Sequence, residues 1–169
     1  MLTMSELDAL IDAYPDLKPA LPRMRLSFAR QARPFHLWPA MKLLSEGQPC
    51  GAFHAVLSGT LQVGAPAEPG EGPPLYSVQR GDFCPVTIGC LLGQAPFPVQ
   101  AVAFTQVRGV AIDRRFFLAL VQNVPAFRLS VFRAVAERVV QWAQPAPAWP
   151  NVRLTPGRLA TRAAVGAAR

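Results

Sequence analysis

The sequence predicts a mainly β domain with flanking helices, in which an antiparallel β-roll of jelly-roll type is followed by a C-terminal dimerisation helix. Over residues 35–112, short apolar runs separated by glycine and proline recur every roughly 8 to 12 residues, as in β-sandwiches and rolls. Before and after that stretch, apolar residues recur at helical spacing. We therefore expect an N-terminal helical segment over 1–34, the roll with its helix over 35–143, and a proline-, alanine- and arginine-rich tail over 144–169.

The N-terminal segment carries the signals of two short helices. Ser5 and Asp8 resemble the ends of a capping box, in which a side-chain hydroxyl accepts a free backbone N–H at a helix start. Pro15 ends this first helix. A second helix is expected over 16–33, broken by Pro19 and Pro22 and packed through Met24, Leu26 and Phe28.

The central segment consists of short candidate strands joined by turns. Gly59 follows Ser58 at a natural tight turn, because glycine adopts positive φ without a steric penalty. Residues 65–74 contain too much proline and glycine to pair, so they predict an exposed loop. The candidate strands cover 35–38, 42–45, 52–58, 60–64, 75–80, 98–104 and 107–112.

Two helices are expected after the last strand. Asp113 can cap a helix that runs through Val121, and Pro125 suits the first turn of the next one, over about 126–143. The apolar surface of this last helix is wider than one packing face needs, which favours a dimerisation helix over the alternative, a helix wholly buried in a monomer. Its expected interface residues are Leu129, Phe132, Val139 and Trp142.

Composition limits the environment and the partners of the chain. A net charge of +7 favours polyanions, and the arginines of residues 145–169 raise it without any acid. The N-terminus is acidic and has no basic leader, and no apolar run is long enough to span a membrane, so we expect a cytoplasmic protein without a membrane partner. The three cysteines have no metal-site or redox spacing and are expected to be reduced and partly buried: Cys50, Cys84 and Cys90.

The order of several short motifs resembles one family of regulators. Glu46-Gly47 precedes a strand, Gly59 turns the first hairpin, and Gly81-Asp82-Phe83 introduces a short helical insertion. Leu91-Leu92-Gly93 and Val124-Pro125 then follow at the matching places. This order is similar to the cyclic-nucleotide-binding sensor domain of the CRP/FNR superfamily of transcription regulators. The resemblance covers residues 35–143 and implies a sensor that passes a conformational change to the dimer helix.

The resemblance also implies a phosphate-binding cassette after Gly81-Asp82-Phe83, where a helix N-terminus, an arginine and a hydroxyl would hold the phosphate. The arginine–serine pair should fall near Phe97-Pro98, where neither side chain can replace it, and only Asp82 is acidic between Gly81 and Gly93. Burying a phosphate without a cation is costly, so we expect no binding of cyclic AMP in the usual way, but an apolar ligand, an atypical nucleotide or no small ligand. The expected pocket consists of Gly81, Asp82, Thr87, Gly89, Cys90, Phe97, Gln100, Val131 and Val135.

Three hypotheses about function follow from these observations. The first is a sensor or effector domain of a CRP/FNR-like transcription regulator, acting as a homodimer with an unknown small-molecule effector. DNA would be read only through a helix-turn-helix, which residues 144–169 are too short to form, so this chain alone is expected not to read DNA. The alternatives are a ligand-free dimerisation module that pairs with a full-length regulator, and a haem or redox sensor.

Catalysis and a resident cofactor are not expected. The sequence has no His/Glu metal set, no GxSxG nucleophile elbow and no glycine-rich phosphate loop. The haem alternative would use His36, His54 or a cysteine as the axial ligand. A structural role is the simpler interpretation of His36 and of His54.

Overall fold

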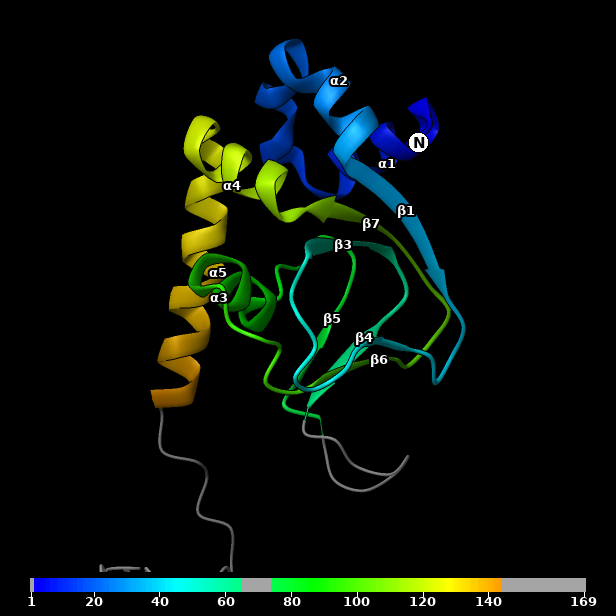
Figure 1. Cartoon of the computed structure of the whole chain (residues 1–169), viewed down its shortest axis with the longest axis vertical. Coiled ribbons are helices and arrows are strands. Elements are labelled where there is room, and N and C mark those ends of the chain that lie inside the picture. The colour runs from blue at the N-terminus through cyan, green and yellow to red at the C-terminus, as the bar shows by residue number, and fades with distance from the viewer. Residues whose placement is uncertain (1, 65–73, 144–169) are drawn as a thin grey trace, which may run out of the picture.

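The computed structural model describes residues 2–64 and 74–143, and Figure 1 shows an N-terminal group of helices and a β-roll, with one long helix running along the side of both. The predicted tail and nearly all of the predicted 65–74 loop lie outside the described residues. Within them, no helix is long and apolar enough to cross a membrane.

The N-terminal segment forms α1 (Met4–Ala13), a 3₁₀ helix η1 (Pro15–Ala20) and α2 (Leu21–Gln31). The predicted capping box was placed two residues too late. Thr3 is the N-cap: its Oγ1 accepts the Glu6 N–H at 3.2 Å, and the Glu6 carboxylate accepts the Thr3 N–H at 2.8 Å. The Thr3 backbone N–H also lowers the pKa of Glu6.

The predicted break in the second helix is confirmed, because the segment divides between Pro19 and Pro22 into η1 and α2. Pro22 lies in the first turn of α2, where its missing N–H has no helical partner to lose. The predicted packing was wrong at one residue. Leu26 is 74% exposed and makes no core contact, whereas Phe28 is fully buried. The Phe28 ring packs edge-on against Phe116, with 4.8 Å between the ring centroids.

Within residues 2–64 and 74–143, seven strands form two antiparallel sheets, which confirms the predicted roll. One sheet has the order β1-β7-β3 and the other β2-β6-β4-β5. The predicted strand positions hold to within a few residues; the largest difference is at the first strand, which begins at Ala32. The strands are β1 (Ala32–Leu37), β2 (Lys42–Leu44), β3 (Ala52–Ser58), β4 (Leu61–Gly64), β5 (Tyr76–Val78), β6 (Gln100–Ala103) and β7 (Val107–Asp113).

The predicted turn at Gly59 is confirmed by its geometry. Its φ is +85°, and a Cβ atom there would lie 2.1 Å from the Gln106 carbonyl oxygen. Glycine is therefore required both by the backbone conformation and by the close approach of the β6–β7 turn.

Three further helices complete the domain: α3 (Pro85–Gly93), α4 (Arg114–Asn123) and α5 (Pro125–Ala143). As predicted, Asp113 caps α4, because its Oδ1 accepts the Arg115 N–H at 2.8 Å. Pro125 occupies the first position of α5, as expected.

Apolar side chains are gathered into two separate cores. The first lies between the helices and the β1-β7-β3 sheet and contains a cluster of rings from β3, α4 and α5, from the residue that caps the end of α1 and from the turn before α3. The second fills the interior of the roll. The ring cluster is formed by Tyr14, Phe53, Phe83, Phe117 and Phe127.

A buried hydroxyl connects the helical segment to the roll. The Tyr14 hydroxyl donates to the Asp82 carbonyl oxygen at 2.9 Å and accepts the Val56 N–H at 3.0 Å. Burial raises the pKa of Tyr14, so the hydroxyl keeps its proton. Gly81 lies beside this bridge, and its N–H donates to the Val56 carbonyl. Its φ is +80°, and a Cβ atom there would lie 2.8 Å from the Ala13 carbonyl oxygen.

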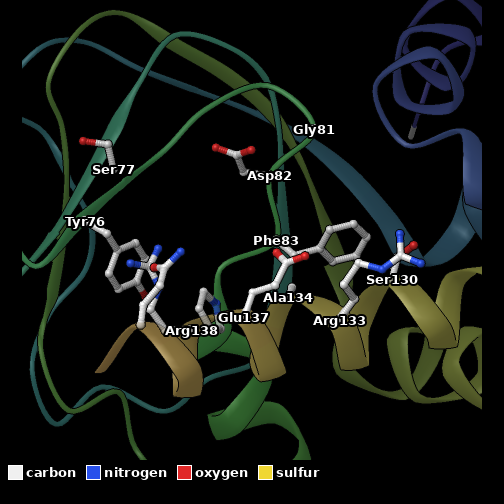
Figure 2. Close-up of a pocket in the computed structure, with 12 residues that line it drawn as sticks. Tyr76, Ser77, Gly81, Asp82, Phe83, Ser130, Arg133, Ala134, Glu137 and Arg138 are labelled. Atoms are coloured by element: carbon white, nitrogen blue, oxygen red, sulfur yellow. The ribbon is translucent and has the colours of Figure 1, made fainter. Parts of the chain in front are cut away.

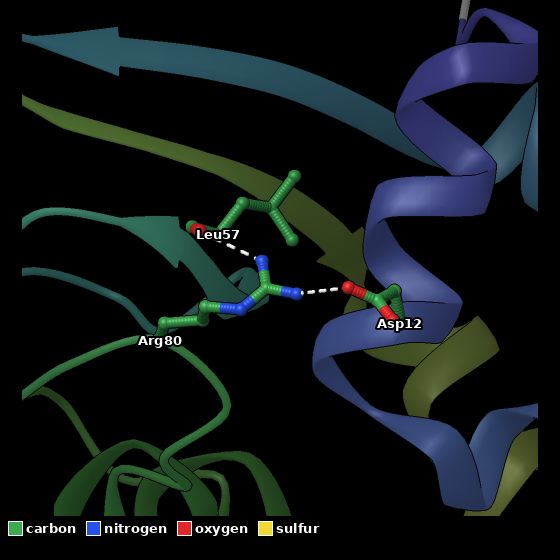
Figure 3. A network of polar contacts seen from close by, with 3 residues as sticks. All are labelled: Asp12, Leu57 and Arg80. Carbon is green, nitrogen blue, oxygen red and sulfur yellow. Dashed lines mark hydrogen bonds and ion pairs between the residues drawn. The ribbon is translucent and has the colours of Figure 1, made fainter.

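A second contact between the same segments lies at the surface. Arg80 forms an ion pair with Asp12 of α1 and donates from Nη1 to the Leu57 carbonyl at 3.1 Å (Figure 3). Both charged side chains are well exposed, so the pair orients the 79–82 turn more than it stabilises the fold.

Replacing Tyr14 by phenylalanine tests the hydroxyl bridge. Tyr14→Phe keeps the ring contacts with Phe53 and Phe83 but leaves a buried N–H and a buried carbonyl without their partner. We expect the free energy of unfolding to fall by about 2–3 kcal/mol in urea denaturation. Tyr14→Leu, which also removes the ring contacts, should cost more, and a Tyr14→Phe value within about 0.5 kcal/mol of the wild type would contradict the bridge.

Candidate ligand-binding site

A cavity of about 340 Å³ opens between the roll and the long helix α5 (Figure 2). The roll side contributes two residues of β5, the turn that follows it and the first residue of α3. The helix side contributes residues from three successive turns of α5. The lining residues are Tyr76, Ser77, Gly81, Asp82, Phe83 and Pro85 from the roll, and Ser130, Arg133, Ala134, Glu137, Arg138 and Gln141 from α5.

Charges of both signs line this cavity. Arg133 and Arg138 supply two cations, and Asp82 and Glu137 supply two carboxylates. The Asp82 side chain is oriented by the turn, because its Oδ2 accepts the Gln79 N–H at 2.8 Å. The guanidinium of Arg138 lies over the Tyr76 ring, 4.1 Å from its centroid. Such a site suits a polar ligand that offers both donors and acceptors.

The start of α5 is held in place by a contact outside the ring cluster. The Ser130 hydroxyl donates to Asp16 Oδ2 of η1 at 2.5 Å. Phe127 and Val131 are fully buried in the first core. The first half of α5 is therefore anchored to the helical segment, and its second half is the part that faces β5 across the cavity.

The N-terminus of α3 provides few open donors for an anion. Pro85 has no N–H, the Thr87 N–H donates to Cys84 Sγ at 3.5 Å, and the Ile88 N–H donates to the Cys84 carbonyl. Burial raises the pKa of Tyr76, and the backbone N–H of Val86 beside its hydroxyl opposes that rise. These N–H groups are the ones that a phosphate would need at the helix start.

Phe97 occupies the interior of the roll. It is fully buried, its N–H donates to the Gln48 carbonyl at 2.9 Å, and its carbonyl accepts the Gly47 N–H at 2.8 Å. Among the described residues, Thr87 is the only buried polar or charged one, so no arginine or lysine enters this core. A phosphate placed there would lack a cation.

The sequence can now be compared with known families. The sequence matches a family model described as the cyclic nucleotide-binding domain over residues 39–124. That match covers half of the chain. The chain belongs to the cyclic nucleotide-binding domain family. No curated protein matches the sequence at a significant level.

Solved structures of several functions have the fold of this cyclic nucleotide-binding domain. A cAMP-binding acyltransferase from Mycobacterium smegmatis is 25% identical, with a TM-score of 0.64 over 82% of this chain, and this chain spans only 43% of its length. The sensor domain of the transcriptional regulator DNR from Pseudomonas aeruginosa is 16% identical, with a TM-score of 0.61, over 79% of this chain and 88% of that one. The regulatory subunit of a cAMP-independent protein kinase A from Trypanosoma brucei is 19% identical, with a TM-score of 0.57, over 80% and 46%. At identities of 16% and 19%, the last two show the fold alone.

The nine residues expected to form the pocket of this cyclic nucleotide-binding domain lie in different places. Gly81 and Asp82 line the cavity. Thr87 and Cys90 are buried in α3, Gly89 is exposed on it, and Gln100 begins β6 half-buried. Phe97 lies in the roll core, and the first core holds Val131, with Val135 packed against it.

Sequence reasoning missed the α5 side of the cavity. Arg133, Glu137 and Gln141 follow one another at intervals of four residues, and Arg138 lies three residues before Gln141, so the four polar side chains share one side of the helix. That pattern was available in the sequence. The apolar residues of the same helix predicted a packing role, and the polar residues between them gave no separate signal of a cavity.

The two histidines lie away from the cavity. His36 is exposed, with its Nε2 2.7 Å from Gln106 Nε2, while His54 packs edge-on against Phe35. Neither histidine and none of the three cysteines lines the cavity, so the haem alternative has no axial ligand there. Among residues 2–64 and 74–143, no three histidine, cysteine or acidic side chains are grouped to hold a metal ion.

The cysteines are packed as small apolar side chains. Cys84 and Cys90 are buried, Cys50 is half-buried, and all three are free thiols, as expected. Burial raises the pKa of Cys50 to about 12 and also raises the pKa of Cys90. Protonated thiols are poor nucleophiles and poor metal ligands, and the Cys50 and Cys90 thiols lie within hydrogen-bonding reach of each other.

His54 generates a prediction about pH. Its Nδ1 is buried without a hydrogen bond, and burial lowers its pKa to about 4. Since the pKa in the unfolded chain is about 6.5, the unfolded state binds the proton first, and stability is lost as the pH falls from about 6.5 towards 4.

We expect the free energy of unfolding to fall by about 2 kcal/mol more in the wild type than in His54→Phe between pH 7 and pH 5, measured by urea denaturation. Acidic residues contribute equally in both proteins, so the comparison isolates the histidine. Equal pH dependence would show that His54 is solvated in the folded state.

Proposed function

We propose that this domain is the sensor of a CRP/FNR-like transcription regulator and that it receives its signal as a small polar effector in the cavity beside α5, instead of cyclic AMP in the roll. The observation that carries the proposal is the position of the cavity, between the 81–83 turn and α5. A ligand that contacts both sides favours one position of α5 over others, and that difference in affinity is what a sensor needs.

The contents of the roll support a signal other than cyclic AMP bound in the usual way. Phe97 fills the space near which the arginine–serine pair is expected, and the helix start beside it is capped by Cys84 and Tyr76. A cyclic nucleotide would have to displace a fully buried ring and then bury its phosphate without a cation. One structural neighbour with this fold, the kinase regulatory subunit from Trypanosoma brucei, belongs to a protein kinase A described as cAMP-independent.

A calorimetric titration with cyclic AMP tests this part of the proposal. We expect no saturable heat with the full chain, that is, a Kd weaker than about 1 mM. The cAMP-binding acyltransferase from Mycobacterium smegmatis, titrated in the same buffer, serves as the positive control. A micromolar Kd for this chain would overturn the argument from the missing arginine.

The exposed side of α5 supports a homodimer. Leu129, Phe132 and Val139 are 57%, 54% and 55% exposed, although a monomer would normally bury such side chains. With Ala136 and Ala143 they follow the alternating three- and four-residue spacing of a coiled-coil seam. Trp142 and Val140, also exposed, flank that seam. A second copy of α5 is the occupant that fits this spacing.

Charge placed in the seam should separate the dimer. We expect Leu129→Glu to raise the dimer dissociation constant about 100-fold, because a carboxylate would be buried without a partner. Leu26→Glu is the matched control, since Leu26 is an exposed leucine on another helix and should leave the dimer intact. Light scattering across a concentration series measures both, and a monomeric wild type or equal effects of the two variants would contradict the seam.

A further inference from the structure

The charge distribution of the N-terminal region is one-sided. Between Asp16 and Glu46 the chain carries six cationic residues and no acidic one. Five of the six lie on η1, on α2 or at the start of β1, and each of these five is exposed. The cations are Lys18, Arg23, Arg25, Arg30, Arg33 and Lys42.

Three of these arginines form one surface, which we call the α2 basic face: Arg23, Arg30 and Arg33. Arg23 and Arg30 are seven residues apart, so they lie on the same side of α2, separated by about 10 Å along its axis. Arg30 and Arg33 line one shallow groove, and the other residues of that groove are small or apolar: Ala29, Ala32 and Pro34.

The face is held outward on a fixed element. Phe28, on the opposite side of α2, is fully buried and packs against Phe116 of α4. Among the described residues, the ion pair of the structure is Arg80 with Asp12, so Arg23, Arg30 and Arg33 form no ion pair with a described carboxylate. Arg25 turns away towards α1, where its Nη2 contacts Met4 Sδ at 3.1 Å.

We propose that the α2 basic face binds the phosphate backbone of nucleic acid, without reading bases. Guanidinium groups bind phosphate oxygens in a bidentate manner, which favours arginine at such a surface. A stretch of duplex about 10 Å long carries about six phosphate charges, enough to face Arg23 and Arg30 together. This function is independent of the effector cavity and of the α5 seam, which lie on other parts of the molecule (Figure 1).

The same face is poorly suited to a lipid surface. An interfacial helix inserts an apolar side, usually with aromatic residues, into the headgroup region. The aromatic residue of α2, Phe28, is buried in the protein, and Leu26 is the large apolar side chain that α2 exposes. A membrane would gain only the electrostatic attraction, whereas a nucleic acid also gains directed hydrogen bonds from the arginines.

Fluorescence anisotropy with a labelled 20-base-pair duplex of arbitrary sequence tests the proposal on the full chain. Arg23→Glu/Arg30→Glu is compared with Lys42→Glu/Arg108→Glu, which changes the net charge equally but on strands of the roll: Lys42 begins β2, and Arg108 of β7 pairs with His36 of β1. Both variants keep residues 144–169, so the arginines of the tail contribute equally to both.

We expect Arg23→Glu/Arg30→Glu to weaken binding at least tenfold at low salt and to reduce the slope of log K against log salt by about two, with a change of less than about threefold in the control. Thermal denaturation of both variants verifies folding, since all four side chains are exposed. Equal weakening in both variants, or no duplex binding by the wild type, would overturn the proposal. So would an Arg23→Glu/Arg30→Glu variant that loses binding to vesicles of anionic lipid but keeps its binding to the duplex.

Discussion

The hydroxyl of Tyr14 joins three segments that are far apart in the sequence. It accepts from β3 and donates to the 79–82 turn, while its ring packs among the phenylalanines of the first core. The turn carries Gly81 and Asp82, which form one wall of the cavity. The cavity therefore has a fixed wall because a buried hydroxyl satisfies two backbone groups that would otherwise be left unpaired.

The opposite wall is set by different forces. α5 begins in the ring cluster, and its second half extends past the last strand of the roll (Figure 1). Along the cavity it presents charged side chains, and the stacking of Arg138 on Tyr76 is a direct contact between the two walls. The polar ligand that we propose for this cavity would have to compete with that contact for the guanidinium of Arg138.

Much of the fold could be predicted from the sequence because the local signals agree with the packing. The strand positions, the Gly59 turn, the Asp113 cap and the Pro125 start follow from backbone chemistry that acts over a few residues. The capping box was misplaced because Thr3 and Ser5 both precede an acidic residue at the right distance, and only the geometry separates them. Leu26 was misplaced because its neighbours at helical spacing include Arg23 and Arg30, so it lies on the charged side of α2 and not on the side of Phe28.

The site was less predictable, since it depends on contacts between distant segments. Nothing near Tyr14 in the sequence indicates that its hydroxyl reaches residues 42 and 68 positions away. The departure at Phe97 was visible as a missing cation, but its burial in the roll core is a property of packing. Family resemblance thus gave an expected place for a cassette after Phe83, and the structure was needed to find the cavity beside α5.

The sides of α5 have different surroundings, and these restrict how the helix can move. One side is buried in the first core, a second lines the cavity, and a third exposes Leu129, Phe132 and Val139. Rotation about the helix axis would break the core contacts of Phe127 and Val131, so it is the least available motion. What remains is a tilt, with the fulcrum at those two residues and the free arm at Val139 to Ala143, so that a small displacement near the cavity is magnified at the far end.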